Sequence, residues 1–139
     1  MQTALSSVLM DRRGASAIEF AIVFPVFLAL TAGMVAYGIY FGAAHSVAQL
    51  AAHAARVSVA GLDDQERNAL AQQHVARSAG VYAFIAPKFV TTVAATADAE
   101  FRVTVRYDVR TLPIWRFAPF LPLPSRIIER SAAIRRGGY

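Results

Sequence analysis

The stretch that decides the fold is GASAIEFAIVFPVFLALTAGMVAYGIYFGAA, residues 14–44. From Phe20 to Ala44 no side chain carries a charge, and about 20 apolar residues suffice to cross a bilayer as a helix. Glu19 stands directly before this uncharged run. A carboxylate at a membrane edge opposes insertion unless it has a partner. The sequence therefore predicts that Glu19 has a function of its own.

The composition around this run limits the class of protein. The chain has 139 residues, of which 56% are hydrophobic, and this suits one small domain carried on a membrane anchor. It has no cysteine, which excludes a disulfide framework, a thiol nucleophile and a cysteine-zinc site. The net charge is +5, but the basic residues are scattered and form no tract. Nucleic-acid binding is therefore not expected.

Three kinds of membrane segment could begin in this way. A secretory signal peptide has an apolar region of about 7–15 residues, which is shorter than the run observed here. A signal anchor would keep Arg12 and Arg13 in the cytoplasm, because basic residues favour that side, and would place the chain from Arg56 onward outside. The third possibility is a short hydrophilic leader that ends at Gly14 and is removed before the apolar run.

Residues 12–26, RRGASAIEFAIVFPV, resemble the N-terminus of the TadE-like family, the pseudopilins or minor pilins of the Tad (Flp) pilus system. In that family a glycine precedes the bond that is cut, and glutamate is the fifth residue of the mature chain. Gly14 and Glu19 match these positions, and Pro25 matches a family proline that the major Flp pilins lack. The resemblance is specific over residues 12–60 and only compositional beyond them.

This resemblance implies a structural subunit with no cofactor and no small-molecule substrate. A prepilin peptidase would cut between Gly14 and Ala15. Glu19, with Phe20 beside it, would serve assembly by meeting the N-terminal amine of a neighbouring mature subunit. The implied partners are the peptidase, other pseudopilins and pilins, the inner-membrane platform and the lipid bilayer. The implied location is the inner membrane, crossed once, with a cytoplasmic N-terminus and a periplasmic C-terminal domain.

The sequence also predicts how the chain is divided. Good helix formers fill residues 16–60, and Pro25 is the one proline among them, so we expect a long helix with a kink at Pro25. The parts expected are a cytoplasmic leader at 1–14, a transmembrane helix with a periplasmic extension at 15–60, and a periplasmic α+β domain at 61–139.

The extension of this helix carries an apolar stripe that should dock on the domain. Its members recur at spacings of three and four: Val47, Leu50, Ala51, Ala54, Val57 and Ala60. Gly61 is expected to end the helix in a left-handed conformation. A second helix is predicted at 64–78, capped by Asp63 or Asp64, with Leu70, Val75 and Ala79 on its apolar side.

The second half of the chain reads as a small antiparallel sheet. Apolar and polar residues alternate over 101–110, which is typical of a half-buried strand. Further strands are expected at 89–94 and 127–134, with a turn at Ala97-Asp98. One long helix, a short second helix and this sheet give an α+β fold like that of pilins.

Four prolines keep residues 112–124 out of a regular ladder, so an apolar loop is expected there. Trp115, Phe117, Phe120 and Leu121 are costly to expose together. They either form an interaction surface, toward another subunit or the lipid, or fold back over the sheet.

No constellation of residues predicts catalysis or metal binding. His45 and His53 are two helical turns apart, too far to share one ion, and no carboxylate lies one turn from either. We interpret these two histidines and His74 as polar surface, and the arginines at 102, 106 and 110 as a solvated sheet face. The chain lacks a phosphate loop and a positioned nucleophile, base and acid. The alternative to a pseudopilin is an unprocessed single-pass protein whose periplasmic domain binds a partner or serves as a scaffold.

Overall fold

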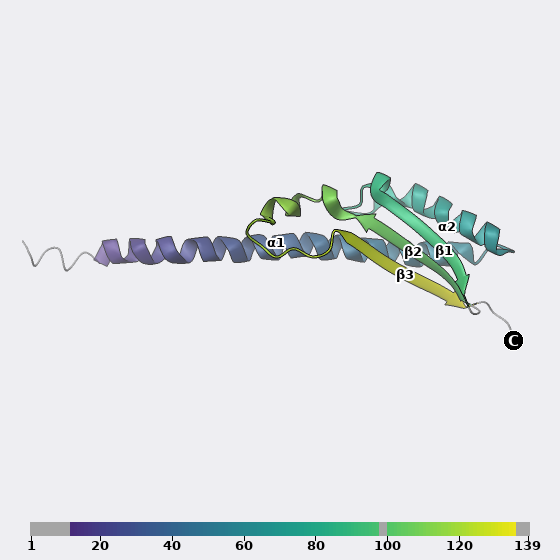
Figure 1. Cartoon of the computed structure of the whole chain (residues 1–139), viewed down its shortest axis with the longest axis horizontal. Helices are drawn as coiled ribbons and strands as arrows, with labels where there is room; N and C mark the ends of the chain where they lie inside the picture. Colours follow the sequence, from purple (N-terminus) through teal and green to yellow (C-terminus); the bar gives the residue numbers. More distant parts are fainter. Residues whose placement is uncertain (1–11, 98–99, 136–139) are drawn as a thin grey trace, which may run out of the picture. The chain divides into compact units, whose positions relative to one another are not determined.

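A computed structural model describes residues 12–97 and 100–135 of the chain, and the side chains of 14–96 and 100–135. It confirms the α+β class, with a long apolar helix, a short second helix and a three-stranded antiparallel sheet (Figure 1). The helices and strands are α1 (Arg12–Ser58), α2 (Asp64–Ser78), β1 (Val90–Ala97), β2 (Glu100–Asp108) and β3 (Ile127–Arg135).

The chain divides into two compact units, one up to Val35 and one from Ala36 onward. The described part of the first unit is the beginning of α1, where the side chains of residues 15–31 are all exposed. By length and composition the segment Gly14–Ser58 can cross a membrane, and its most apolar 18-residue window has a mean hydropathy of 2.2. This apolar N-terminal helix suggests a membrane anchor. Pro25 lies inside α1, and the kink expected there remains a prediction.

The second unit builds its core on the apolar stripe of α1. Val47, Leu50, Ala51 and Ala54 are fully buried, as predicted. Val57 and Ala60 are exposed, so these two predictions were wrong. Ser58 takes their place, because a step of four from Ala54 stays on the same helical face. Its hydroxyl is satisfied locally, since Oγ donates to the carbonyl oxygen of Ala55 at 2.6 Å.

The start of α2 is fixed by two carboxylates. Asp63 is the N-cap, and its Oδ1 accepts from the backbone N–H of Glu66 at 2.7 Å. Glu66 reaches back, and its Oε2 accepts from the N–H of Leu62 at 2.8 Å. Ala71, Val75 and Ala79 are buried on the inner side of α2 and just past its end. Leu70, which was expected there, is half-buried.

Gly61 does end the turn after α1, but not for the predicted reason. No described glycine has a positive φ angle, so the expected left-handed conformation is absent from the described residues. What Gly61 meets is the backbone of α2. A Cβ placed on it would lie 2.7 Å from the backbone nitrogen of Arg67 and 3.0 Å from its Cα. The position therefore requires glycine because two backbone segments approach closely there.

Replacing Gly61 by alanine should consequently destabilise the second unit. Forcing an atom into a closed contact costs about 1–3 kcal/mol, because the backbone of α2 must shift. Thermal unfolding of the full chain in detergent, followed by circular dichroism, measures this loss. Gly38→Ala is the matched control, since a Cβ there meets nothing within 4 Å. A Gly61→Ala chain as stable as Gly38→Ala would contradict the close-approach explanation.

The sheet has the order β1-β2-β3, and β2 is antiparallel to both neighbours. The alternation predicted for β2 is confirmed, since its inward side chains are buried: Phe101, Val103, Val105 and Tyr107. The strand ends at Asp108 rather than at residue 110. Its carboxylate accepts from the N–H of Arg110 at 3.0 Å and starts a short 3-10 turn, Val109–Thr111. The turn expected at Ala97-Asp98 lies partly outside the described residues.

Candidate functional site

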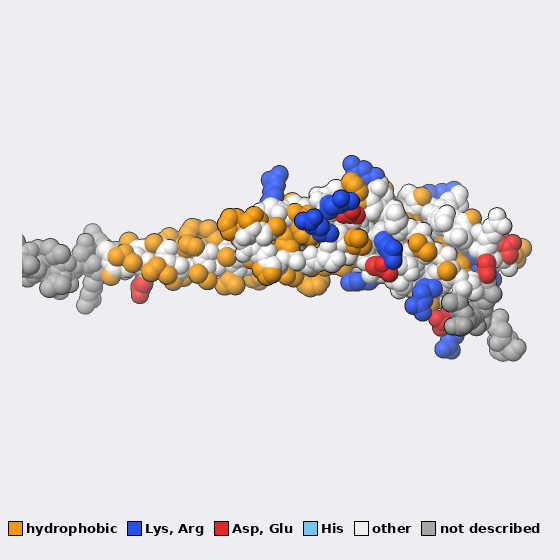
Figure 2. Space-filling model, viewed as in Figure 1, with side chains coloured by type: hydrophobic (Ala, Val, Ile, Leu, Met, Phe, Trp, Pro, Cys, Tyr) orange, Lys and Arg blue, Asp and Glu red, His pale blue; other side chains and the backbone are white. Residues whose placement is uncertain are grey.

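The N-terminal junction places one carboxylate on an otherwise apolar helix surface. Glu19 is exposed, and its neighbours Ile18 and Phe20 are 65% and 64% exposed. Figure 2 shows hydrophobic side chains gathered along this first part of α1. Among the side chains of 14–96 and 100–135, none forms an ion pair with Glu19. The carboxylate can therefore take a partner from another molecule.

The bond predicted to be cut lies inside a helix. Gly14 and Ala15 both fall in the first turn of α1, which begins at Arg12. The backbone must be extended to enter a peptidase site, so cleavage would require this turn to unwind. A first turn is the part of a helix that unwinds most readily, because its leading N–H groups have no partner within the helix.

The four residues predicted to form an interaction surface differ in how far they are buried. Trp115 and Phe117 are partly buried and pack against the core. The indole Nε1 of Trp115 donates to the carbonyl oxygen of Val109 at 2.6 Å, which holds the loop on the end of the sheet. Leu121 is half-buried, whereas Phe120 is 81% exposed. Of the four residues, Trp115 and Phe117 therefore fold back and Phe120 alone remains largely on the surface.

A contact that the sequence did not reveal ties this loop to α1. The phenol of Tyr37 donates to the carbonyl oxygen of Pro122 at 2.7 Å, and both residues belong to the second unit. The sequence feature that could have pointed to this contact is a tyrosine in a stretch of small and apolar residues. Its partner is a backbone carbonyl 85 positions away, which no pattern in the sequence could identify.

The arginines of the sheet face are largely paired. Arg106 meets Glu129 at 2.5 Å, and Arg102 lies 3.6 Å from Glu100. Arg110 bonds Asp108, and this hydrogen bond holds the pKa of the Asp108 carboxyl below its ordinary value. These pairs are exposed, and exposed pairs contribute at most about 1 kcal/mol each. They are consistent with a solvated face rather than a basic stripe awaiting a partner.

Two histidines meet across the helices, which the sequence interpretation missed. His45 is exposed and bonds Gln49 at 2.8 Å. The rings of His53 on α1 and His74 on α2 stack with centroids 6.3 Å apart and planes 7° apart. The Nε2 atom of His74 is buried without a hydrogen-bond partner. Burial, and then the charge of His53, lowers the pKa of His74. No cluster of three metal-ligating side chains occurs in the described part of the chain.

This histidine pair should make the second unit sensitive to acid. Because the pKa of His74 is lower in the folded chain, the unfolded chain binds more protons as the pH falls below the ordinary histidine value of about 6.5. Stability present above that value is lost as the pH falls toward the folded pKa. We expect the melting temperature of His74→Gln to fall less than that of the wild type between about pH 7.5 and about pH 5.5. His45→Gln is the control and should behave as wild type; equal acid sensitivity of all three chains would refute the assignment.

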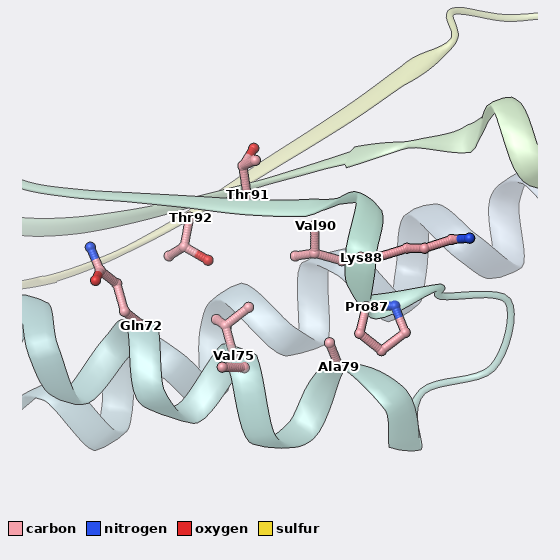
Figure 3. Close-up of a pocket in the computed structure, with 9 residues that line it drawn as sticks. Gln72, Val75, Ala79, Pro87, Lys88, Val90, Thr91 and Thr92 are labelled. Atoms are coloured by element: carbon pink, nitrogen blue, oxygen red, sulfur yellow. The ribbon is translucent and has the colours of Figure 1, made fainter.

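A groove of about 620 Å³ lies between α2 and β1. Figure 3 shows Gln72 and Val75 of α2 and Thr92 of β1 along it. The Nζ atom of Lys88, the one cation in its lining, lies 4.9 Å from the ring centroid of Phe89. The lining holds no carboxylate and no histidine. It therefore brings together no acid and base that could serve a reaction.

Comparison with known proteins gives one family match, and it lies on α1. The family model of TadE-like proteins matches residues 14–56, a segment that begins at Gly14 and ends near the end of α1. No curated protein and no solved structure matches the chain. The matched family is structural and pilus-related, not enzymatic. The match over residues 14–56 thus confirms the resemblance drawn from the sequence, and the long helix of this chain is similar to that of TadE-like proteins.

Proposed function

We propose that this chain is a pseudopilin, a structural and assembly subunit of a Tad (Flp) pilus or a related secretion system. The observation that carries the proposal is the family match over 14–56, which begins on the exposed apolar part of α1, where Glu19 forms no ion pair with any described side chain. In this proposal the chain is made in the inner membrane, and a prepilin peptidase removes residues 1–14. The domain that follows α1 faces the periplasm.

The chemistry of assembly follows from the charges at the junction. Cleavage would create a positive amine on Ala15, one helical turn before the carboxylate of Glu19. Either charge alone is unfavourable in lipid. The carboxylate of one subunit can meet the amine of the next, so that both charges are neutralised at once. This contact would favour a defined stagger between neighbouring helices.

The rest of the first unit suits packing between subunits. Its described apolar side chains have no partner within the chain's own core, as the exposure of Ile22, Leu30 and Met34 shows. Small residues such as Gly33 let helices approach closely in lipid. The partners proposed are other pseudopilins and pilins and the inner-membrane platform of the Tad system.

Deleting the coding sequence in the native host tests this function. We expect the surface filaments to be lost, and a plasmid copy of the intact chain to restore them. Filaments counted by electron microscopy give the measurement. Normal numbers of filaments in the deletion strain would contradict the proposal.

One observation favours a second candidate. Gly14 and Ala15 lie within a helix rather than in an extended segment. This fits an unprocessed single-pass inner-membrane protein whose periplasmic domain binds a partner or acts as a scaffold. The two candidates differ in the N-terminus of the chain in cells, which is Ala15 for a pseudopilin and Met1 for the unprocessed protein.

A further inference from the structure

We propose that the loop between β2 and β3 docks the second unit on the surface of an anionic bilayer, with Phe120 inserted in the interfacial layer. The inference rests on the proposed membrane anchor and adds a second membrane contact to it. Its ligand is the lipid surface itself, recognised by one exposed aromatic side chain and nearby arginines.

The loop presents Phe120 in a fixed position. A 3-10 helix, Pro113–Phe117, leads into it, with Ile114 fully buried beneath. The N–H groups of Phe120 and Leu121 both bond the carbonyl oxygen of Phe117 at 2.9 Å. The loop is thus anchored in the core and closed by hydrogen bonds, yet Phe120 is 81% exposed. The loop therefore holds the ring of Phe120 where a surface outside the chain can cover it.

The hydrogen bond to Tyr37 places this loop at the level where α1 would leave the bilayer. A span of about 20 residues counted from Ala17 ends at Ala36, and one counted from Phe20 ends at Ile39. Tyr37 lies between these two limits, and tyrosine is enriched where a membrane meets water. Because its phenol bonds the carbonyl oxygen of Pro122 at 2.7 Å, the loop lies at the same depth.

The charges of the loop favour binding to an anionic surface. Residues 109–126 contain three arginines and no carboxylate. Arg110 is already paired with Asp108 at the base of the loop, at 2.6 Å. Arg116 and Arg126 are exposed, and Arg126 also lies over the ring of Trp115 at 5.3 Å. Basic side chains beside the anchor attract anionic lipid headgroups.

Four carboxylates lie at the other end of the second unit, whereas Asp108 and Glu129, at the loop's end of the sheet, are each paired with an arginine. Asp63, Asp64 and Glu66 stand at the start of α2, and Glu100 begins β2. Figure 1 shows the loop, in green to yellow between β2 and β3, at the end of this unit opposite the start of α2. With the loop at the membrane, the exposed Phe120 and Arg116 would face the lipid, and the start of α2 would point away from it.

The chain has no cysteine, so a single cysteine can report the depth of any position. Three variants are labelled with an environment-sensitive NBD dye, Phe120→Cys, Leu62→Cys and Leu28→Cys. The full chain is reconstituted in nanodiscs of phosphatidylglycerol and phosphatidylcholine, and quenching is measured with lipids that carry a shallow spin label. Leu62 is the matched control, since it is 90% exposed and lies beside the acidic start of α2.

We expect the dye at position 120 to be quenched several-fold more than the dye at position 62. Equal quenching at the two positions would overturn the inference. So would a dye at position 120 that is shielded from aqueous iodide but not quenched by lipid, because a protein partner would then cover it. Position 28 separates the two proposals, since the absence of lipid quenching there would contradict the anchor itself.

A second experiment tests whether the loop requires anionic lipid. Arg116→Gln should reduce quenching at position 120, as should replacing phosphatidylglycerol by phosphatidylcholine, while quenching at position 28 stays unchanged. Arg56→Gln is the matched control, because Arg56 is exposed in the last turn of α1, far along the helix from Tyr37. Loss of quenching from Arg56→Gln and not from Arg116→Gln would contradict the assigned surface.

Discussion

Replacing Glu19 by alanine is expected to abolish filament assembly while leaving cleavage after Gly14 largely intact. The reason is electrostatic, since the variant leaves the amine of a neighbouring subunit without a partner where unpaired charge is costly. The carboxylate is exposed and meets no described cation within the chain, so its removal should not disturb the fold. Filament counts and the mobility of the processed chain on a gel measure the two effects separately.

Two further variants sharpen this test. Glu19→Gln keeps the size of the side chain but removes its charge, and should fail in assembly as alanine does. Glu129→Ala removes another exposed carboxylate, whose surface pair with Arg106 is worth little, and should assemble normally. Normal filaments from Glu19→Ala would show that the carboxylate serves no assembly contact.

Replacing Gly14 by leucine is expected to abolish removal of residues 1–14. A branched side chain beside the scissile bond would block the close approach that a peptidase needs to the backbone, whereas glycine leaves it open. The unprocessed chain should accumulate in the membrane and run larger on a gel. Ser6→Leu adds the same side chain eight positions earlier and should be processed as wild type. Full processing of Gly14→Leu would contradict the position of the cut.

The sequence predicted those parts of the fold that depend on local pattern. The uncharged run sets α1, the strict alternation of Phe101, Val103 and Val105 sets β2, and the carboxylates at 63–66 set the start of α2. Each of these signals comes from neighbours within a few positions. The N-terminal junction could be identified for the same reason, because its residues stand within one short motif.

What the sequence did not predict depends on contacts between distant segments. The stripe of α1 passes through Ser58 rather than Val57, because the domain covers that face and the chain leaves the helix there. The stacking of His53 on His74 follows from how α2 returns along α1, not from any spacing. The same holds for the hydrogen bond between Tyr37 and Pro122, which lie 85 positions apart.

The measurement that tests the central claim most directly is the mass and N-terminal sequence of the chain extracted from cells with and without the prepilin peptidase. The account predicts a chain that begins at Ala15 when the peptidase is present and at Met1 when it is absent. A chain that begins at Met1 in both kinds of cell would contradict it, and would favour the unprocessed membrane protein instead.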